Sequence, residues 1–418
     1  MTETYPKTPA PVPTMRARTG RVRRRVRLLL APFWVVPAVW AVGALAIGLA
    51  LPLLEKAGEN PAPLLFQGGV DSARAVLSTT AGAMISVTGL VFSITIVVLQ
   101  LASSQFSPRV LGTFLESRVT QHTLGVFVAS FLYSLAVLRS IVDLGAGEAP
   151  AISVTLSFLF VLGSVGMFLA FIHHITRSIS VANIIRRVGD ESRTLLERSL
   201  DRREGLPASP PELAAPEGQT VVVARRSGYL DALDIARLTR HASERDARIE
   251  LLVPLGSFVP EGGPLALVAG PGDNDWDATV DDAVSLRNER SMEQDLTFGF
   301  RRLVDIAERA LSPGINDPTT AVQCVDEMHD LLRRLVTQGP VVGVHVDHDD
   351  VPRVLVREVS FSQYLDLAVD EVAHYGRDGI QIPARLHLML TDLLAAAEPT
   401  YHDCLHGKQA QLDAAGVS

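Results

Sequence analysis

Histidine and carboxylate side chains that could bind a divalent metal ion gather in one short segment of the C-terminal half. His345 and Asp347 would point to the same face of a strand, because side chains alternate along a strand. Imidazole and carboxylate groups together suit several divalent ions. His348 extends the set, but Asp349 and Asp350 make an acidic surface loop the favoured interpretation. His345, Asp347 and His348 are the candidate metal ligands. We expect no bound cofactor.

A second group of metal-binding residue types lies near the C-terminus, at His402, Cys404 and His406. Closed structural zinc sites use four ligands, and this group offers three. The chain has only one further cysteine, Cys324, so it cannot build a four-thiolate site. Chain ends are also often poorly ordered. We therefore favour an ordinary chain end over a metal clip.

A distinctive segment, residues 310–321, is typical of a junction between two helices. Its candidate residues are Ser312, Pro313, Gly314, Asn316, Asp317 and Pro318. Pro313 and Gly314 would end the first helix. Asn316 or Asp317 would cap the second, and Pro318 would take its first position. Amides at such a helix start can hold an anion or a ligand carboxylate, although Asp317 would oppose one. We favour a structural junction, with a ligand or inter-subunit role as the alternative.

Small and hydroxyl side chains form a stripe along the uncharged segment Ala75–Pro108. At 3.6 residues per turn they fall within an arc of about 80°, and the opposite side carries Leu, Val and Ile. The stripe consists of Ser78, Gly82, Ser86, Gly89, Ser93, Gln100 and Ser104. Such a stripe permits close helix packing or lines a water-filled path. We favour packing and keep a pore as the alternative, since the 34 uncharged residues exceed one bilayer crossing.

Four long apolar segments without Asp, Glu, Lys or Arg must position these side chains. They are Leu28–Leu54, Ala75–Pro108, Val119–Leu138 and Ala149–Thr176. Each supplies the roughly 20 residues that cross a hydrocarbon core of about 30 Å. Buried helices of soluble domains are rarely so long and uncharged. The segments predict an α-helical membrane domain with four transmembrane helices, and the lipid bilayer as its partner.

Charged residues beside the spans predict their orientation. Seven arginines between Arg16 and Arg27 precede the first span, and cytoplasmic flanks collect Lys and Arg. The first and third loops are acidic, whereas the second loop and the residues after the fourth span are basic. Both the N-terminus and the C-terminal region are therefore predicted on the cytoplasmic side.

Charge is divided unevenly along the chain. Before residue 175 there are 13 basic and 7 acidic residues. From residue 175 onward there are 25 basic and 39 acidic residues. An acidic C-terminal region disfavours nucleic-acid binding, which depends on neutralising phosphates. Lysine occurs only at Lys7, Lys56 and Lys408. We expect none of them to be ordered in the C-terminal region, which excludes Schiff-base and P-loop chemistry.

Beyond the spans, the residue pattern predicts an α+β domain. The predicted divisions are a basic arm at 1–27, the membrane domain at 28–176, a helical stalk and linker at 177–218, the α+β cytoplasmic domain at 219–400 and a C-terminal tail at 401–418. Apolar stripes predict helices over 296–310, 322–335, 361–375 and 383–397, and a further helix is expected over 231–244. Runs rich in β-branched residues predict strands over 220–224, 249–254, 265–269 and 353–359.

Two segments resemble a bacterial family of predicted integral membrane proteins of unknown function. They are Leu99–Arg109, with the sequence Leu-Gln-Leu-Ala-Ser-Ser-Gln-Phe-Ser-Pro-Arg, and Asp305–Pro318, which contains Ala-Leu-Ser-Pro-Gly-Ile-Asn-Asp-Pro. With the four spans, the resemblance covers most of residues 20–400. It implies architecture only and assigns no catalytic residue. We expect the protein to lie in a bacterial inner membrane, with both ends of the chain cytoplasmic.

Three functions compete at this level. The first is an oligomeric channel or transport-like protein with a regulatory cytoplasmic domain, and a homo-oligomer is expected because four spans are few for a path within one chain. The second is a membrane-anchored sensor or scaffold whose cytoplasmic domain binds a ligand or a protein. The third is an enzyme using the segment around His345. The usual motifs of hydrolases, zinc proteases, P-loop proteins and dinucleotide-binding enzymes do not occur, so we lean away from an enzyme.

Overall fold

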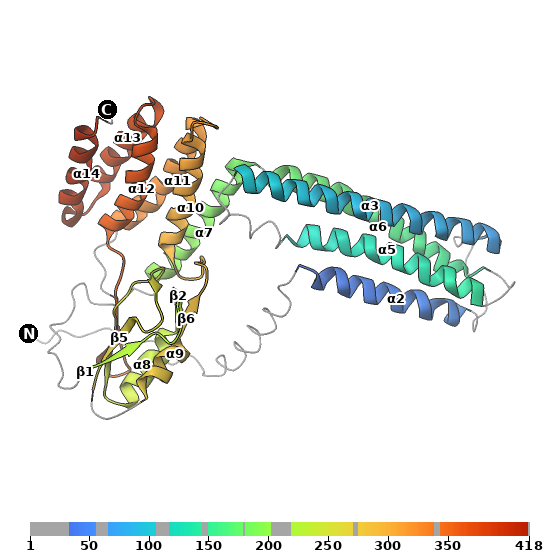
Figure 1. The fold of residues 1–418 in the computed structure, drawn as a ribbon, viewed down its shortest axis with the longest axis horizontal. Helices are drawn as coiled ribbons and strands as arrows, with labels where there is room; N and C mark the ends of the chain where they lie inside the picture. The colour runs from blue at the N-terminus through green and yellow to red at the C-terminus, as the bar shows by residue number, and fades with distance from the viewer. Residues whose placement is uncertain are drawn as a thin grey trace, which may run out of the picture. The chain divides into compact units, whose positions relative to one another are not determined.

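The chain folds into two compact units. The computed structural model describes residues 33–55, 66–105, 117–143, 149–178, 180–201, 219–270, 275–337 and 343–416. The first unit comprises residues 1–104 and 110–179 and holds long apolar helices, whereas the second comprises residues 105–109 and 180–418 and combines helices with two sheets (Figure 1). The predicted fold class, a four-helix membrane domain followed by an α+β domain, is confirmed.

Four helices in the described part of the chain are long and apolar enough to cross a membrane. They are α2 (Val35–Glu55), α3 (Val70–Gln105), α5 (Arg118–Asp143) and α6 (Ala151–Ser178). At about 1.5 Å per residue, each can span a hydrocarbon core of about 30 Å. Each predicted span therefore corresponds to a helix, although the start of the first span, before residue 33, lies outside the described residues.

The helix α5 forms the buried centre of the first unit. Its Phe127 and Tyr133 side chains are fully buried. Gly125 of α5 lies against the indole of Trp40 from α2, and a side chain at this position would overlap that ring. Gly48 of α2 lies against α5 as well, where an added Cβ atom would come within 2.8 Å of the Ala136 Cβ and 3.1 Å of the Tyr133 carbonyl oxygen. Glycines at these positions allow α2 and α5 to approach closely.

The helix α7 (Val181–Asp201) is separate from α6 and belongs to the second unit. It packs against α10 (Leu296–Leu311) and α11 (Pro318–Val336), where Gly189 lies against Glu327 and Ser192 against Gly299. Arg193 of α7 donates a hydrogen bond of 2.7 Å to the Glu327 carboxylate. This differs from the predicted stalk over 177–218, because the polar helix finds its partners within the α+β domain. The predicted linker, residues 202–218, lies outside the described residues.

Two sheets form the β part of the second unit. The larger has the strand order β1 (Gln219–Val223), β5 (Pro264–Ala269), β3 (Arg248–Leu251), β8 (Pro352–Val356) and β7 (Gly343–Val346). The smaller has the order β4 (Phe258–Val259), β2 (Gly228–Leu233) and β6 (Val284–Arg287). β3 and β8 pair in parallel, and the other neighbours pair antiparallel. The sheets share a core with α8 (Ile235–Glu244) and α9 (Trp276–Ala283), in which Leu238, Ile249 and Leu251 are fully buried.

The helix predicted over 231–244 is wrong in its first residues, because β2 continues to Leu233. Asp234 caps α8 by accepting a hydrogen bond of 3.1 Å from the backbone N–H of Arg237. A capping aspartate marks the start of a helix. The boundary between strand and helix therefore falls at Asp234.

The remaining helices pack side by side as a second layer (Figure 1). α10 and α11 are followed by α12 (Phe361–Gly376) and α13 (Gln381–Ala396). The four predicted apolar stripes become the buried faces of these helices, with Phe300, Met328, Leu365 and Leu390 each no more than 1% exposed. The helices predicted here, and the strands near 220, 249, 265 and 353, are confirmed.

The helix α14 (His402–Ala414) occupies most of the segment predicted as a tail. Lys408 lies on it with a side chain only 6% exposed, and its Nζ lies 2.6 Å from a carboxylate oxygen of both Asp366 and Asp370 on α12. The expectation that no lysine of the C-terminal region would be ordered is therefore wrong. Burial alone would lower the pKa of Lys408, but the two carboxylates hold the pKa above its ordinary value. A lysine held in its charged form is not a Schiff-base nucleophile.

Replacing Lys408 by methionine should loosen α14 from α12. Two half-exposed carboxylates would lose their shared cation, which we expect to cost roughly 1–3 kcal/mol. Limited proteolysis of the full chain should then cut faster between residues 397 and 414 in Lys408→Met, whereas Lys408→Arg keeps the charge and should stay resistant. Equal cleavage of Lys408→Met and the unsubstituted chain would contradict this role.

Candidate functional site

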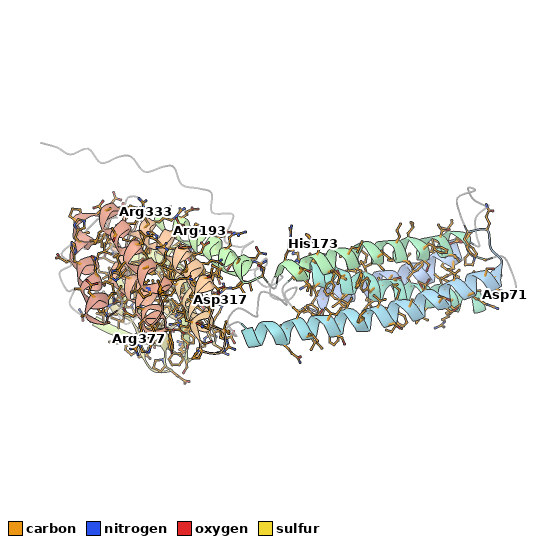
Figure 2. The ribbon with its side chains drawn as sticks, turned by 90° about the horizontal axis from the view of Figure 1, so that it is seen from above. Asp71, His173, Arg193, Asp317, Arg333 and Arg377 are labelled. Atoms are coloured by element: carbon orange, nitrogen blue, oxygen red, sulfur yellow. The ribbon has the colours of Figure 1, made fainter. Side chains whose placement is uncertain are left out.

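The polar stripe predicted in the second span lies on the outer face of α3. Ser78, Gly82, Ser86, Gly89, Ser93 and Gln100 are all exposed, whereas the buried side chains of α3 are Ala73, Leu77, Ala81, Met84 and Val91. At about 100° per residue, these two sets occupy opposite sides of the helix. Figure 2 shows α3 along one side of the membrane unit. The side chain of Ser104 lies outside the described residues.

The glycines of this stripe are not used for packing among the described residues. A Cβ atom placed on Gly82 or Gly89 would meet no heavy atom within 4 Å, and the same holds for Gly163 and Gly166 of α6. The glycines that do allow close approach are on α2 and α5, as described above. If the stripe packs against a helix, that helix is none of those described in this chain.

Hydroxyl groups of the stripe bond to their own helix. Ser78 Oγ donates to the carbonyl oxygen of Ala75 at 3.1 Å, and Ser86 Oγ donates to that of Gly82 at 3.0 Å. Gln100 lies on the same exposed face, and a primary amide in hydrocarbon costs roughly 2–7 kcal/mol without hydrogen-bond partners. These polar groups on the outer face of α3 therefore suit water or another protein surface better than lipid, whereas Leu90, Phe92 and Val97, also exposed on α3, are apolar.

Hydroxyl groups also connect α5 to α6 inside the unit. Tyr133 Oη donates a hydrogen bond of 2.9 Å to the carbonyl oxygen of Ser153, and the hydroxyl oxygens of Ser134 and Ser157 lie 3.1 Å apart. All four side chains are fully buried. Sequence reasoning missed this contact, although the four-residue spacing from Ser130 to Ser134 and from Ser153 to Ser157 was a readable signal.

The carboxylate of Glu55 caps the start of α6. It accepts hydrogen bonds from the backbone N–H groups of Ile152, at 3.2 Å, and Ser153, at 2.7 Å. The Ser153 hydroxyl donates to the same carboxylate at 2.5 Å. The first amides of a helix have no partner within it, so an acceptor from another helix satisfies them. The predicted acidic character of the first loop thus includes a residue with a structural role.

The predicted helix junction is present, and Asp317 is the residue that caps α11. Its carboxylate accepts hydrogen bonds from the Thr320 hydroxyl, at 2.6 Å, and from the Thr320 backbone N–H, at 3.1 Å. These bonds hold the pKa of Asp317 below its ordinary value. Asn316 takes a φ of 51°, a conformation that asparagine tolerates better than most residues. The carboxylate fills the place an anion would take, which favours the structural interpretation; Figure 2 labels Asp317.

The candidate metal ligands divide into a buried and an exposed part. Asp347 is 3% exposed at its side chain and accepts hydrogen bonds from Arg353 Nε, at 2.7 Å, and Ser243 Oγ, at 3.0 Å. Burial alone would raise the pKa of Asp347, but these bonds and two backbone N–H groups hold it well below its ordinary range. His348 and Asp349 are exposed and lie 3.1 Å apart.

Of the described residues, Asp347, His348 and Asp349 form the one group whose possible metal-ligating atoms lie within 4.8 Å of one another. His345, the other candidate, lies on β7 and is not a member of it. Asp347 already binds the guanidinium of Arg353, so its carboxylate is less available to a cation. This arrangement favours the acidic-loop interpretation.

Two of the three residues near the C-terminus, His402 and Cys404, are engaged with the backbone. Cys404 Sγ donates to the carbonyl oxygen of Tyr401 at 3.0 Å, and His402 Nε2 lies 3.3 Å from that of Ala397. His402 and His406 lie one turn apart on α14 with ring centroids separated by 6.3 Å. Burial raises the pKa of the Cys404 thiol, which disfavours the thiolate that a metal ion requires.

Comparison with known proteins assigns the chain to a family. The family model described as "Predicted membrane protein (DUF2254)" matches residues 31–392. The chain belongs to this family. It is also 31% identical over 405 residues to the uncharacterized protein Rv1290c of Mycobacterium tuberculosis (strain ATCC 25618 / H37Rv) and to the uncharacterized protein Mb1321c of Mycobacterium bovis (strain ATCC BAA-935 / AF2122/97). Each match covers 93% of this chain and 75% of the relative.

The family membership confirms the resemblance stated from the sequence and describes a membrane protein of unknown activity. No solved structure matches this chain. The functional interpretation therefore depends on the geometry of this family member itself.

Removing the Asp317 carboxylate should fray the start of α11. Asp317→Ala loses a cap that contributes about 1 kcal/mol, so hydrogen exchange in residues 318–322 of the full chain should accelerate several-fold. Asp317→Asn retains an acceptor oxygen and should exchange at nearly the original rate. If both variants exchange like the unsubstituted chain, the cap does not stabilise this junction.

Proposed function

We propose that the protein is a subunit of an oligomeric channel or transport-like protein in a bacterial inner membrane. In this proposal the outer face of α3 lines the path, and the α+β unit is a regulatory domain on the cytoplasmic side. The observation that carries the proposal is the exposure of the stripe from Ser78 to Gln100 on the face opposite the buried side chains of α3. A face of small and hydroxyl groups suits a water-filled path.

A path between chains is favoured over one inside a single chain. The centre of the membrane unit is filled by α5, whose Phe127, Tyr133 and Val137 are fully buried. Several copies that turn their α3 helices toward a common axis would remove the polar face from lipid. They would leave the apolar faces of α2 and α6, with exposed residues such as Leu54 and Leu162, in contact with lipid.

The cytoplasmic orientation is supported by charge. The residues before the first span and those after the fourth are rich in arginine, and Arg186 and Arg187 at the start of α7 are exposed. Basic flanks stay on the cytoplasmic side of a bacterial inner membrane. With four spans, both ends of the chain lie on that side.

A leucine in the stripe should block conduction. Ser86→Leu and Ser93→Leu each place a branched apolar side chain on the exposed face without touching the buried one, so ion flux from liposomes containing the purified full chain should fall at least tenfold. Thr176→Leu is the matched control, because Thr176 is an exposed hydroxyl on α6 that bonds to its own helix as Ser86 does. Unchanged flux in both stripe variants, or equal loss in the control, would contradict the path.

The alternative is a membrane-anchored sensor or scaffold. It is favoured by the second unit, which has its own hydrophobic core and its own ion pairs among helices, as at Arg193 with Glu327 and Asp330. In this alternative the face of α3 is an interface between copies and conducts nothing.

Cross-linking separates the two possibilities. If α3 helices from different copies face one another, Ser93→Cys should form disulfide-linked dimers in native membranes, whereas Leu162→Cys on the lipid-facing side of α6 should not. Cross-linked protein that conducts no ions would support the scaffold. Absence of a specific cross-link would count against an α3 interface in either function.

A further inference from the structure

A single guanidinium lies among three carboxylates where α10 meets α12. Arg301 contacts Asp305 at 2.5 Å and Glu308 at 3.1 Å on its own helix, and Glu371 of α12 at 2.6 Å. The Asp305 and Glu308 side chains are 9% and 25% exposed, so water screens them incompletely. We call these four residues the Arg301 cluster.

The Arg301 cluster has more negative than positive groups. If all three carboxylates were ionised, one guanidinium would face three negative charges in a partly buried site. Carboxylates that lie so close repel one another, which disfavours the simultaneous ionisation of all three. Glu308 and Glu371 both contact the Arg301 guanidinium, at 3.1 Å and 2.6 Å, which brings their carboxyl groups close together. Two carboxyl groups can bond to each other only when one carries a proton. A shared proton therefore relieves the repulsion.

The directions in which the pKa values of Glu308 and Glu371 shift agree with the geometry of the Arg301 cluster. Burial and the bond to Glu371 raise the pKa of Glu308 to about 7, although Arg301 acts in the opposite direction. The bond from Glu308 lowers the pKa of Glu371, which thereby stays the ionised partner. The proton belongs to the pair rather than to either residue alone.

Other charged groups on the neighbouring helices have partners elsewhere. On the α7 side of α10, Arg302 pairs with Glu191. Glu327 and Asp330 of α11 pair with Arg193, and Asp366 and Asp370 of α12 pair with Lys408. Two further charged or titratable groups lie one turn from members of the cluster: Arg309 after Asp305 on α10, and His374 after Glu371 on α12.

We propose that the Arg301 cluster is a pH-responsive contact, closed between α10 and α12 by a proton shared between Glu308 and Glu371 and loosened when that proton is lost. A group with a raised pKa in the closed state stabilises that state below its ordinary pKa, and the contribution is lost as pH rises through the raised value. The contact is therefore firm at mildly acidic pH and weaker above neutrality. Glu371 acts in the opposite sense, but its lowered pKa places that change at more acidic pH.

The position of the Arg301 cluster on α10 allows a change in its packing to affect the rest of the second unit. Asp305 and Glu308 lie about two turns and one turn, respectively, before the end of α10, which leads through Ser312 into the junction capped by Asp317. Loosening α12 would change the packing of α10 just before that junction. The inference does not depend on whether the protein conducts ions.

Hydrogen exchange of the full chain in detergent, compared at about pH 5.5 and about pH 8 after correction for intrinsic exchange, tests the device. We expect residues 361–376 and 301–311 to lose protection several-fold at the higher pH. Glu308→Gln should remain protected at both pH values, because its amide can donate to Glu371 as the shared proton does. Glu191→Gln, which alters the carboxylate facing Arg302 on the other side of α10, should keep the original pH response.

Two results would overturn the proposal. One is equal protection of the unsubstituted chain at both pH values. The other is a pH response that persists in Glu308→Gln. If that variant does not fold, Glu371→Gln decides the question: without a second carboxylate the pKa of Glu308 should fall, and the response should leave this pH range. A response of unchanged size in Glu371→Gln would contradict the shared proton.

Discussion

A backbone inside hydrocarbon must satisfy its hydrogen bonds within its own segment, and the membrane unit follows from this constraint. The four apolar segments form long helices because a helix pairs amides and carbonyls within one continuous segment. The polar groups that still need hydrogen-bond partners are the side-chain hydroxyls and the backbone groups at the helix ends. Some of those facing inward find partners on another helix, as Tyr133 does with Ser153 and as the start of α6 does with Glu55. Those facing outward on α3 bond back to their own helix.

This distribution separates two kinds of small-residue surface. At Gly48 and Gly125, the missing side chain is what lets α2 and α5 approach within one chain. At Gly82 and Gly89, the same residue type faces open space. A lipid-facing helix has no need of glycine, serine and glutamine on one side. The polar residues on the outer face of α3 therefore have no packing role among the described residues of this chain, and the proposed function rests on them.

The second unit is organised by apolar burial and by arginines that bridge helices. Arg193 joins α7 to α11, Arg301 joins α10 to α12, and Arg385 joins α13 to Asp326 of α11. Arginine suits this task because its planar guanidinium binds several carboxylate oxygens at once. These pairs are partly exposed, so each adds modestly to stability. Their greater effect is to determine which helix faces pack together. In our proposal, the packing of α10 against α12 at the Arg301 cluster also depends on a proton.

The sequence by itself determined the number of spans, the α+β character of the second unit, most of its helices and the arc of the polar stripe. These features are local: chain length without charge sets a span, and residue periodicity sets the face of a helix or strand. Only the tertiary structure decided that the stripe of α3 points away from its own bundle, because periodicity defines a face but not what covers it. It alone assigned α7 and α14 to the α+β unit and brought Glu371 beside Glu308, which lies 63 positions earlier in the chain. Contacts between residues far apart in the chain depend on how the helices pack, and the local periodicity of the sequence does not predict them.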